Sequence, residues 1–167
     1  MSPLFVHLPD WVWLVPALPL VAVVINAVRV LLGSATGDAA EPLTARLSSL
    51  AAFGGFALML AIDALALSDG APGHRRLGHW FGNGNWEVSL SFLLGPLSLT
   101  LGTLTALIVW LVTRFSANYL HREAGFHRFF IALGFFLAGI QIVLLAGNGV
   151  LAFVGWEMCG VSSFLLI

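Results

Sequence analysis

A single carboxylate, Glu157, lies in the middle of the apolar run LAFVGWEMCGVSSFLLI, which extends from Leu151 to Ile167. In a helix that begins at Gly149, this side chain lies about 12 to 14 Å into a hydrocarbon core about 30 Å thick. An acid at that depth commonly marks a proton relay, an ion path or a buried salt bridge. We therefore predict that Glu157 is a proton-relay acid; the alternative is a protonated side chain that packs against a neighbouring helix.

The sequence offers no partner for Glu157 at the same depth. All seven basic residues are arginines, and none lies deep inside an apolar segment. An acid whose charge depends on a nearby cation can take up a proton when the cation withdraws and release it when the cation returns. We therefore expect the cation to come from outside these residues.

Six further polar residues are weaker candidates for a proton path: Gln141, Ser162 and Ser163 in apolar segments, and His121, Glu123 and His127 in a loop. Imidazole titrates near neutral pH, so a His-carboxylate-His group could collect protons at an entry mouth. The glutamine could instead tie two helices together, and the serines could bond to their own backbone carbonyls. The loop could simply be solvated, and its spacing matches no metal-ligand pattern.

Three polar residues near the ends of apolar segments have ordinary explanations. Asp63 lies four residues before the end of the second segment, where we expect a solvated position. Asn26 and Arg29 lie near the end of the first segment, where an arginine extends its charge to the interface.

Five apolar segments must position these residues, because a membrane-spanning helix needs about 20 apolar residues. Between the second and third segments, residues 68–95 include a period-two alternation that begins at Trp86, just after the turn dipeptide Asn83-Gly84. This pattern predicts a β-hairpin on the membrane surface, with an irregular loop as the alternative. The predicted spans of this single membrane domain, residues 1–167, are Trp11–Leu32, Thr44–Leu67, Pro96–Asn118, Phe126–Ala146 and Gly149–Ile167.

The arginines predict the orientation of the spans, because basic residues are retained on the cytoplasmic side. Five arginines flank the first and third connections between segments, and two lie in the hairpin loop. We therefore expect the N-terminus and the hairpin outside the cytoplasm. The last apolar run stops at Ile167 without a polar flank, so we expect either a fragment or a helix that ends against a partner.

The composition places the chain in a membrane. Hydrophobic residues make up 59% and charged residues 9% of the 167 residues, against about 45 to 50% and about 25% in soluble domains. The formal net charge of -1 and the absence of a basic patch exclude nucleic acid as a partner. One cysteine supports neither a disulfide framework nor a cysteine cluster for zinc or iron-sulfur, so redox chemistry must occur in another chain.

The segments YLHREAGFHRFF and LAGNGVLAFVGWEMCGVSSFLLI resemble the antiporter-like subunits of respiratory complex I, in particular the subunit 5 type, and the related Mrp-type transporters. The GPLSLT start of the third segment and the hairpin before it also match. One departure is Gly95, which stands where many relatives have an acid. The matching positions are Tyr119, Glu123, Gly125, Arg128, Phe129, Phe130, Asn148, Gly155, Trp156, Glu157, Gly160, Ser163, Leu165, Leu166 and Ile167.

The resemblance implies an all-α fold of about 14 helices with inverted repeats, of which this chain would be the N-terminal part. It implies that Glu157 pairs with a lysine on a later helix. It also implies a non-redox subunit of a proton-pumping NADH:quinone oxidoreductase, with flavin, iron-sulfur and quinone held by partner subunits. We expect no cofactor in this chain, other integral membrane subunits as partners, and a multi-pass location in a bacterial cytoplasmic membrane.

Three alternatives remain at this point. The chain could belong to an inorganic-carbon uptake complex or to an Mrp-type cation/proton antiporter of the same superfamily. It could also be an accessory structural subunit without transport of its own. The intact Gly155-Trp156-Glu157 motif favours the respiratory function.

Overall fold

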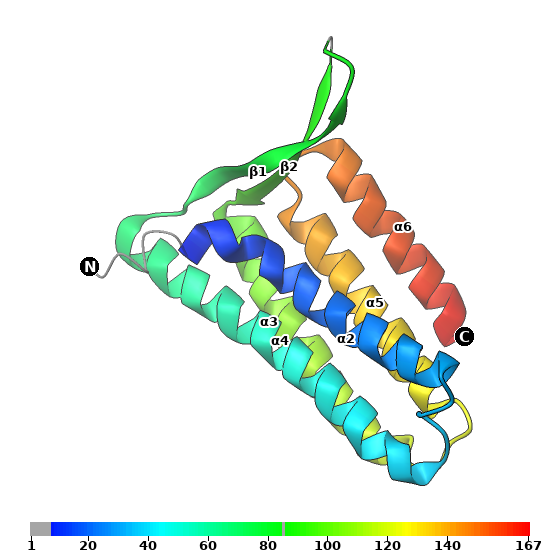
Figure 1. The fold of residues 1–167 in the computed structure, drawn as a ribbon. Helices are drawn as coiled ribbons and strands as arrows, with labels where there is room; N and C mark the ends of the chain where they lie inside the picture. Colours follow the sequence, from blue (N-terminus) through cyan, green and yellow to red (C-terminus); the bar gives the residue numbers. More distant parts are fainter. Residues whose placement is uncertain (1–7, 85) are drawn as a thin grey trace.

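The computed structural model describes residues 8–84 and 86–167, which form five long helices and one hairpin (Figure 1). All five helices are long and apolar enough to cross a membrane. The predicted class, a helical membrane protein with a small antiparallel hairpin, is therefore confirmed. In chain order the elements are η1 (Leu8–Trp13), α2 (Leu14–Leu31), η2 (Asp38–Ala40), α3 (Glu41–Asp69), β1 (Gly73–Gly82), β2 (Glu87–Leu94), α4 (Pro96–Tyr119), α5 (Phe126–Leu145) and α6 (Gly149–Leu166).

The second span begins earlier than its apolar segment. Helix α3 starts at Glu41 instead of Thr44, with a proline in its first turn. Proline fits the first turn because its missing N–H would have no partner there. With 29 residues the helix is about 43 Å long, which exceeds the thickness of a hydrocarbon core of about 30 Å.

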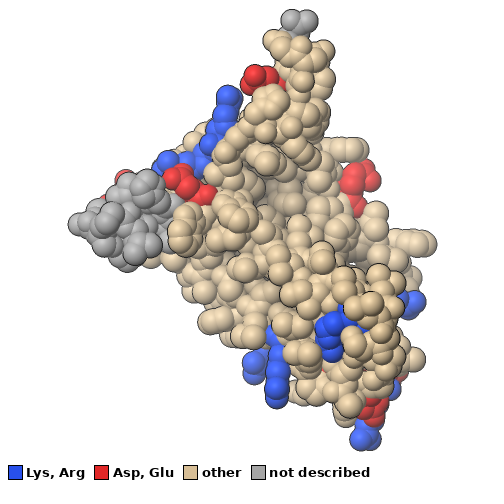
Figure 2. Space-filling model, in the orientation of Figure 1, with Lys and Arg blue, Asp and Glu red and all other residues tan. Residues whose placement is uncertain are grey.

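The two ends of the bundle are distinct. At the hairpin end, β1 and β2 lie across the helix ends and the tip projects beyond them (Figure 1). At the opposite end, here named the loop end, residues 32–40 and 120–125 connect the helices. Charged atoms gather toward the two ends of the face shown in Figure 2, and much of the middle is uncharged.

Strand β2 is covered on both faces at Ser91 and Phe92. It pairs antiparallel with β1, Gly73 opposite Leu94 and Gly82 opposite Glu87. A hairpin lying on a surface would keep one polar face in water, yet Ser91 is only 1% and Phe92 4% exposed. The reason is the α5–α6 turn, where the Gly147 N–H donates to the Ser91 carbonyl at 2.8 Å.

Helix α5 lies at the centre of the bundle and α6 at its edge (Figure 1). Half of α5 is buried, compared with 17% of α6. Within the described chain, α6 packs mainly against α5, and the rest of its surface stays uncovered. The main apolar core joins the hairpin-side halves of the helices to the hairpin through Val12, Val15, Met59, Ile62, Phe92, Leu94, Leu99, Ile142, Leu145 and Leu151.

Two glycines bring α5 and α6 into close contact. A Cβ on Gly155 would lie 2.7 Å from the Gly139 carbonyl oxygen and 2.8 Å from the Val143 nitrogen. A Cβ on Gly139 would lie 2.9 Å from the Met158 Cβ. Small residues of this kind allow helix backbones to approach closely in membranes.

We expect Gly155→Ala to destabilise the packing of α6 by about 1 to 3 kcal/mol, because the added methyl group meets rigid backbone atoms. Gly160→Ala is the matched control on the same helix, since no atom lies within 4 Å of its added Cβ. Thermal unfolding of the detergent-solubilised protein measures both. Equal melting temperatures for the two variants would contradict the close contact.

Candidate functional site

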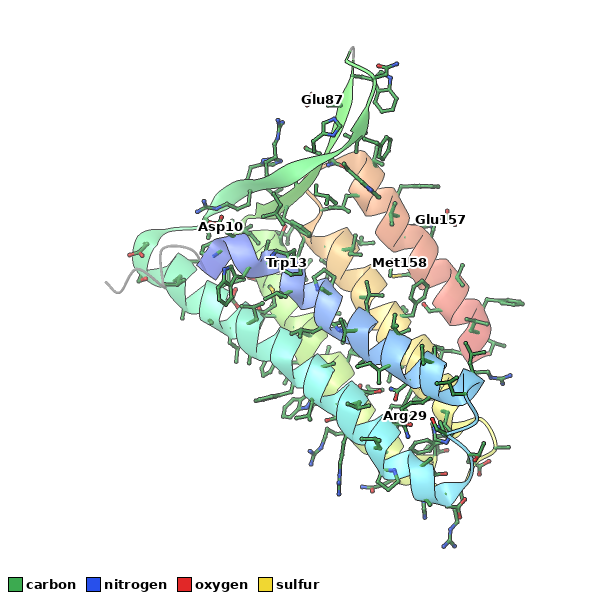
Figure 3. All side chains as sticks on the ribbon, in the orientation of Figure 1. Asp10, Trp13, Arg29, Glu87, Glu157 and Met158 are labelled. Carbon is green, nitrogen blue, oxygen red and sulfur yellow. The ribbon has the colours of Figure 1, made fainter. Side chains whose placement is uncertain are left out.

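Glu157 lies near the middle of α6. The helix has 18 residues, or about 27 Å, and Glu157 is about 12 Å from its start at Gly149. Figure 3 shows Glu157 on the side of α6 that faces away from α5, whereas Met158 faces α5. The carboxylate therefore lies halfway along the edge helix, on its uncovered face.

Glu157 has no ion pair with any residue in 8–84 or 86–167. The side chains that share its exposed face are large and apolar: Phe153 is 62%, Trp156 70% and Phe164 79% exposed. A carboxylate facing lipid at the bilayer centre costs about 2.5 to 3.5 kcal/mol on insertion scales, and more by other estimates. A cationic group that contacted this face of α6 would therefore find an acidic partner in Glu157.

Asn148 fixes the start of the helix that carries Glu157. Its Oδ1 accepts from the Leu151 N–H at 2.8 Å, which caps α6. Its Nδ2 donates to the Ser89 carbonyl at 2.7 Å and to Ser91 Oγ at 2.9 Å. One side chain thus ties the first turn of α6 to strand β2.

The other candidates in the spans make helix contacts. Gln141 is fully buried, and its Nε2 donates to the Gly102 carbonyl of α4 at 2.9 Å. Ser162 is also buried, and its Oγ lies within hydrogen-bonding distance of the Met158 and Cys159 carbonyls of its own helix. Ser163 is exposed on α6. The structure thus does not join these three side chains to Glu157 by any hydrogen bond in the described chain.

The loop candidates do not form one His-carboxylate-His group. His121 Nδ1 lies 2.7 Å from Glu41 Oε2, so its acidic partner is Glu41 on α3 and not Glu123. His127 Nδ1 lies 2.9 Å from Thr44 Oγ1. Glu123 is exposed and lines a groove of about 570 Å³ together with Arg128. The first turn of α3 supplies the partners of both histidines, and no hydrogen bond in the described chain joins Glu123 to either of them. A role of these residues in a proton path stays a prediction.

A polar network continues from the loop end into the bundle. Arg29 Nη1 donates to Thr44 Oγ1 at 2.9 Å and to Asn26 Oδ1 at 3.1 Å. Asn26 Nδ2 donates in turn to Ser48 Oγ at 3.1 Å, and both of these side chains are buried. Arg29, labelled in Figure 3, therefore turns inward to neutral acceptors instead of extending only toward the interface. The same end of the bundle also holds His121, Glu41, Thr44 and His127. Arg122 pairs with Asp38 there at 3.2 Å.

Sequence reasoning did not name Glu41, and it gave Thr44 only as the start of a span and Asn148 only as a position that matches the family. Asn148 directly precedes an apolar helical segment, which is the usual signature of an N-cap. Glu41 lies beside a proline in the first turn of a helix, where the helix dipole favours an acid. Thr44 carries no comparable signal, because its role depends on His127 and Arg29 from other helices.

Asp63 is not simply solvated. Thr103 Oγ1 on α4 donates to its Oδ2 at 2.6 Å, and its Oδ1 is buried. Counting residues to the helix end located Asp63 close to the interface but did not reveal that α4 covers it.

The sequence matches a known protein family. The family described as NADH-ubiquinone oxidoreductase (complex I), chain 5 N-terminus, matches residues 80–130, from the end of β1 into α5. NADH-quinone oxidoreductase subunit L of Mycobacterium tuberculosis is 34% identical over 94% of this chain. NADH-ubiquinone oxidoreductase chain 5 of Elephas maximus is 36% identical over 67% of this chain.

A chloroplastic NAD(P)H-quinone oxidoreductase subunit 5 from Ceratophyllum demersum is 26% identical over 96% of this chain. The chain spans 24% of the Mycobacterium relative, 18% of the Elephas relative and 22% of the Ceratophyllum relative. It therefore corresponds to about a quarter or less of these proteins.

The two roles of Asn148 can be separated by substitution. We expect Asn148→Asp to keep the cap on the Leu151 N–H but to lose the donors to Ser89 and Ser91, whereas Asn148→Ala loses both. The Leu151 N–H bonds to Asn148 itself, and the Gly147 N–H bonds to Ser91 beside the Asn148 donors. A neutral hydrogen bond contributes about 1 kcal/mol, so each of these amides should exchange roughly fivefold faster or more when its support is lost. Hydrogen exchange should show faster Gly147 exchange in both variants and faster Leu151 exchange only in Asn148→Ala. Unchanged Leu151 exchange in Asn148→Ala would contradict the capping role.

Proposed function

The chain belongs to the antiporter-like, subunit 5-type membrane subunits of complex I, and on that premise we propose that it is the N-terminal part of a proton-translocating subunit. In this proposal Glu157 is the intramembrane proton-relay acid that pairs with a lysine outside this chain. The single observation that carries it is the position of Glu157, halfway along α6 and on its uncovered face.

The proposed chemistry is a reversible protonation controlled by distance. When the lysine ammonium lies beside Glu157, the ionised carboxylate is stabilised and its proton leaves. When the ammonium moves away, the charged form has no partner in hydrocarbon and the carboxylate takes up a proton. Small changes in the distance between the two groups would thus load and unload one proton.

The relatives favour the respiratory function over the alternatives. Those described above are named as NADH-quinone, NADH-ubiquinone or NAD(P)H-quinone oxidoreductase subunits, which supports a respiratory or related electron-transfer complex over inorganic-carbon uptake or an Mrp-type antiporter. We propose that other integral membrane subunits are partners of the full-length protein, and that partner subunits hold flavin, iron-sulfur clusters and quinone. A bacterial cytoplasmic membrane is the proposed location.

The loop end is proposed to face the cytoplasm. Arg29, Arg46, Arg114, Arg122 and Arg128 flank the connections at this end, whereas Arg75 and Arg76 lie in β1 at the other end. Basic residues in short loops are retained on the cytoplasmic side. The hairpin and the start of α6 would then lie on the outer side of the membrane.

Replacement of Glu157 by Gln in the full-length subunit, within the assembled complex, should reduce proton pumping per NADH oxidised by roughly tenfold or more. Glu87→Gln removes the same charge from an exposed position in the hairpin and is the matched control. Pumping by reconstituted vesicles and assembly of the complex are measured for both variants. Normal pumping by an assembled Glu157→Gln complex would reduce this residue to a packing role.

The orientation predicts which side of the membrane a label reaches. With Cys159 replaced by Ala, a cysteine at His79 should react with an impermeant maleimide from outside, because this exposed residue lies in β1. A cysteine at Ala124, exposed in the loop between α4 and α5, should react only after the membrane is opened. The reverse pattern would invert the proposed topology.

A further inference from the structure

One carboxylate oxygen of Asp63, Oδ1, is buried and has no hydrogen-bond donor in the described chain. Its Oδ2 accepts from Thr103 Oγ1 at 2.6 Å, across the α3–α4 interface. Its Oδ1 is buried and accepts no hydrogen bond from the described residues. Buried polar atoms without a partner are rare in native structures, and each requires an explanation. Asp63 therefore presents a proton-accepting atom that the fold positions but does not use.

A groove connects Asp63 with the hairpin end of the bundle. The groove has a volume of about 350 Å³, and its walls include Ala71, Pro96 and Thr100 together with Asp63. Ala71 lies between α3 and β1, and Pro96 is the first residue of α4. Asp63 itself is six residues from the end of α3, or about 9 Å. The groove therefore lies between the hairpin-side surface and Asp63.

The charges near Asp63 leave its carboxyl group without an ion pair in the described chain. The charged residue of α4, Arg114, and the basic residues at the start of α5 lie toward the loop end. Asp10 of η1 pairs with Arg75 of β1 at 3.6 Å. Asp69 on the same helix is exposed. Protonation would therefore neutralise the Asp63 carboxylate without breaking an ion pair.

A second acceptor lies at nearly the same level on another side of α4. Gln141 Nε2 must face the Gly102 carbonyl, to which it donates at 2.9 Å, and this leaves its Oε1 buried without a donor from the described chain. Gly102 and Thr103 are consecutive, so they differ by about 1.5 Å along the helix axis. Asp63 Oδ1 and Gln141 Oε1 are thus two buried acceptors without a donor in the described chain, and they lie at similar positions along α4.

We propose that Asp63 is a proton-binding site that exchanges protons with the solution on the hairpin side through this groove. A proton from that solution adds to the carboxylate and converts it to a carboxylic acid; no other bond changes. Thr103 is a positioning residue that holds the carboxyl group through Oδ2. The role of this site in translocation rests on the proposed function, whereas proton binding itself does not.

The probe for this site is N,N′-dicyclohexylcarbodiimide, which modifies protonated carboxyl groups in apolar surroundings. The full-length subunit, in its complex and in sealed vesicles, is treated at a series of pH values, and peptide mass spectrometry measures modification of Asp63 and of Asp69, the exposed control. Modification of Asp63 should rise severalfold as the pH on the hairpin side falls, while Asp69 stays nearly unmodified. Absence of modification at every pH, or modification that follows the pH on the loop side, would overturn the proposal.

Two variants make the result specific. Thr103→Val should increase Asp63 modification severalfold at a given pH, because the ionised carboxylate loses its donor; an unchanged yield would overturn the role of Thr103. Glu157→Gln should leave Asp63 modification intact, because the labelling does not depend on pumping. If Asp63 is not modified but Glu157→Gln still reduces pumping, only the Asp63 site is rejected. If Asp63 is modified as expected but Glu157→Gln pumps normally, only the proposed function is rejected.

Discussion

A charge inside a hydrocarbon layer needs a partner, and this requirement governs how the chain places its polar side chains. At the loop end, Arg29 turns to Asn26 and Thr44, and Glu41 meets His121 at 2.7 Å. Glu157 is different, because the described residues give it no cation at mid-depth. Glu157 thus differs from Arg29 and Glu41 in lacking a partner within the described chain, and the proposed function rests on this difference.

The position of Glu157 depends on contacts that are far from the carboxylate itself. Asn148 caps α6 and bonds to β2, while Gly155 allows the backbones of α5 and α6 to approach. The hairpin and the start of α6 thus share hydrogen bonds, so the hairpin helps to hold the first turn of α6 in place. The hairpin is thus part of the support of the proposed relay acid, in addition to closing one end of the bundle.

Hydropathy and segment length were sufficient to predict five spans, and residue alternation was sufficient to predict the hairpin, because both are local properties of the chain. The depth of Glu157 followed from counting residues along one helix. The pairing of His121 with Glu41 did not follow, since these residues are 80 positions apart and meet only through the packing of α3 beside the α4–α5 loop. The burial of Asp63 depends in the same way on which face of α3 contacts α4, and no local pattern encodes that face.

The central claim is that a cation from outside this chain meets Glu157 within the membrane. A structure of the full-length subunit in its complex measures this directly, as the distance from the Glu157 carboxylate to the nearest lysine nitrogen. The account predicts an ion pair within about 4 Å, or a chain of ordered waters that joins the two groups. A Glu157 side chain surrounded by lipid acyl chains, with no cation or water in reach, would contradict it.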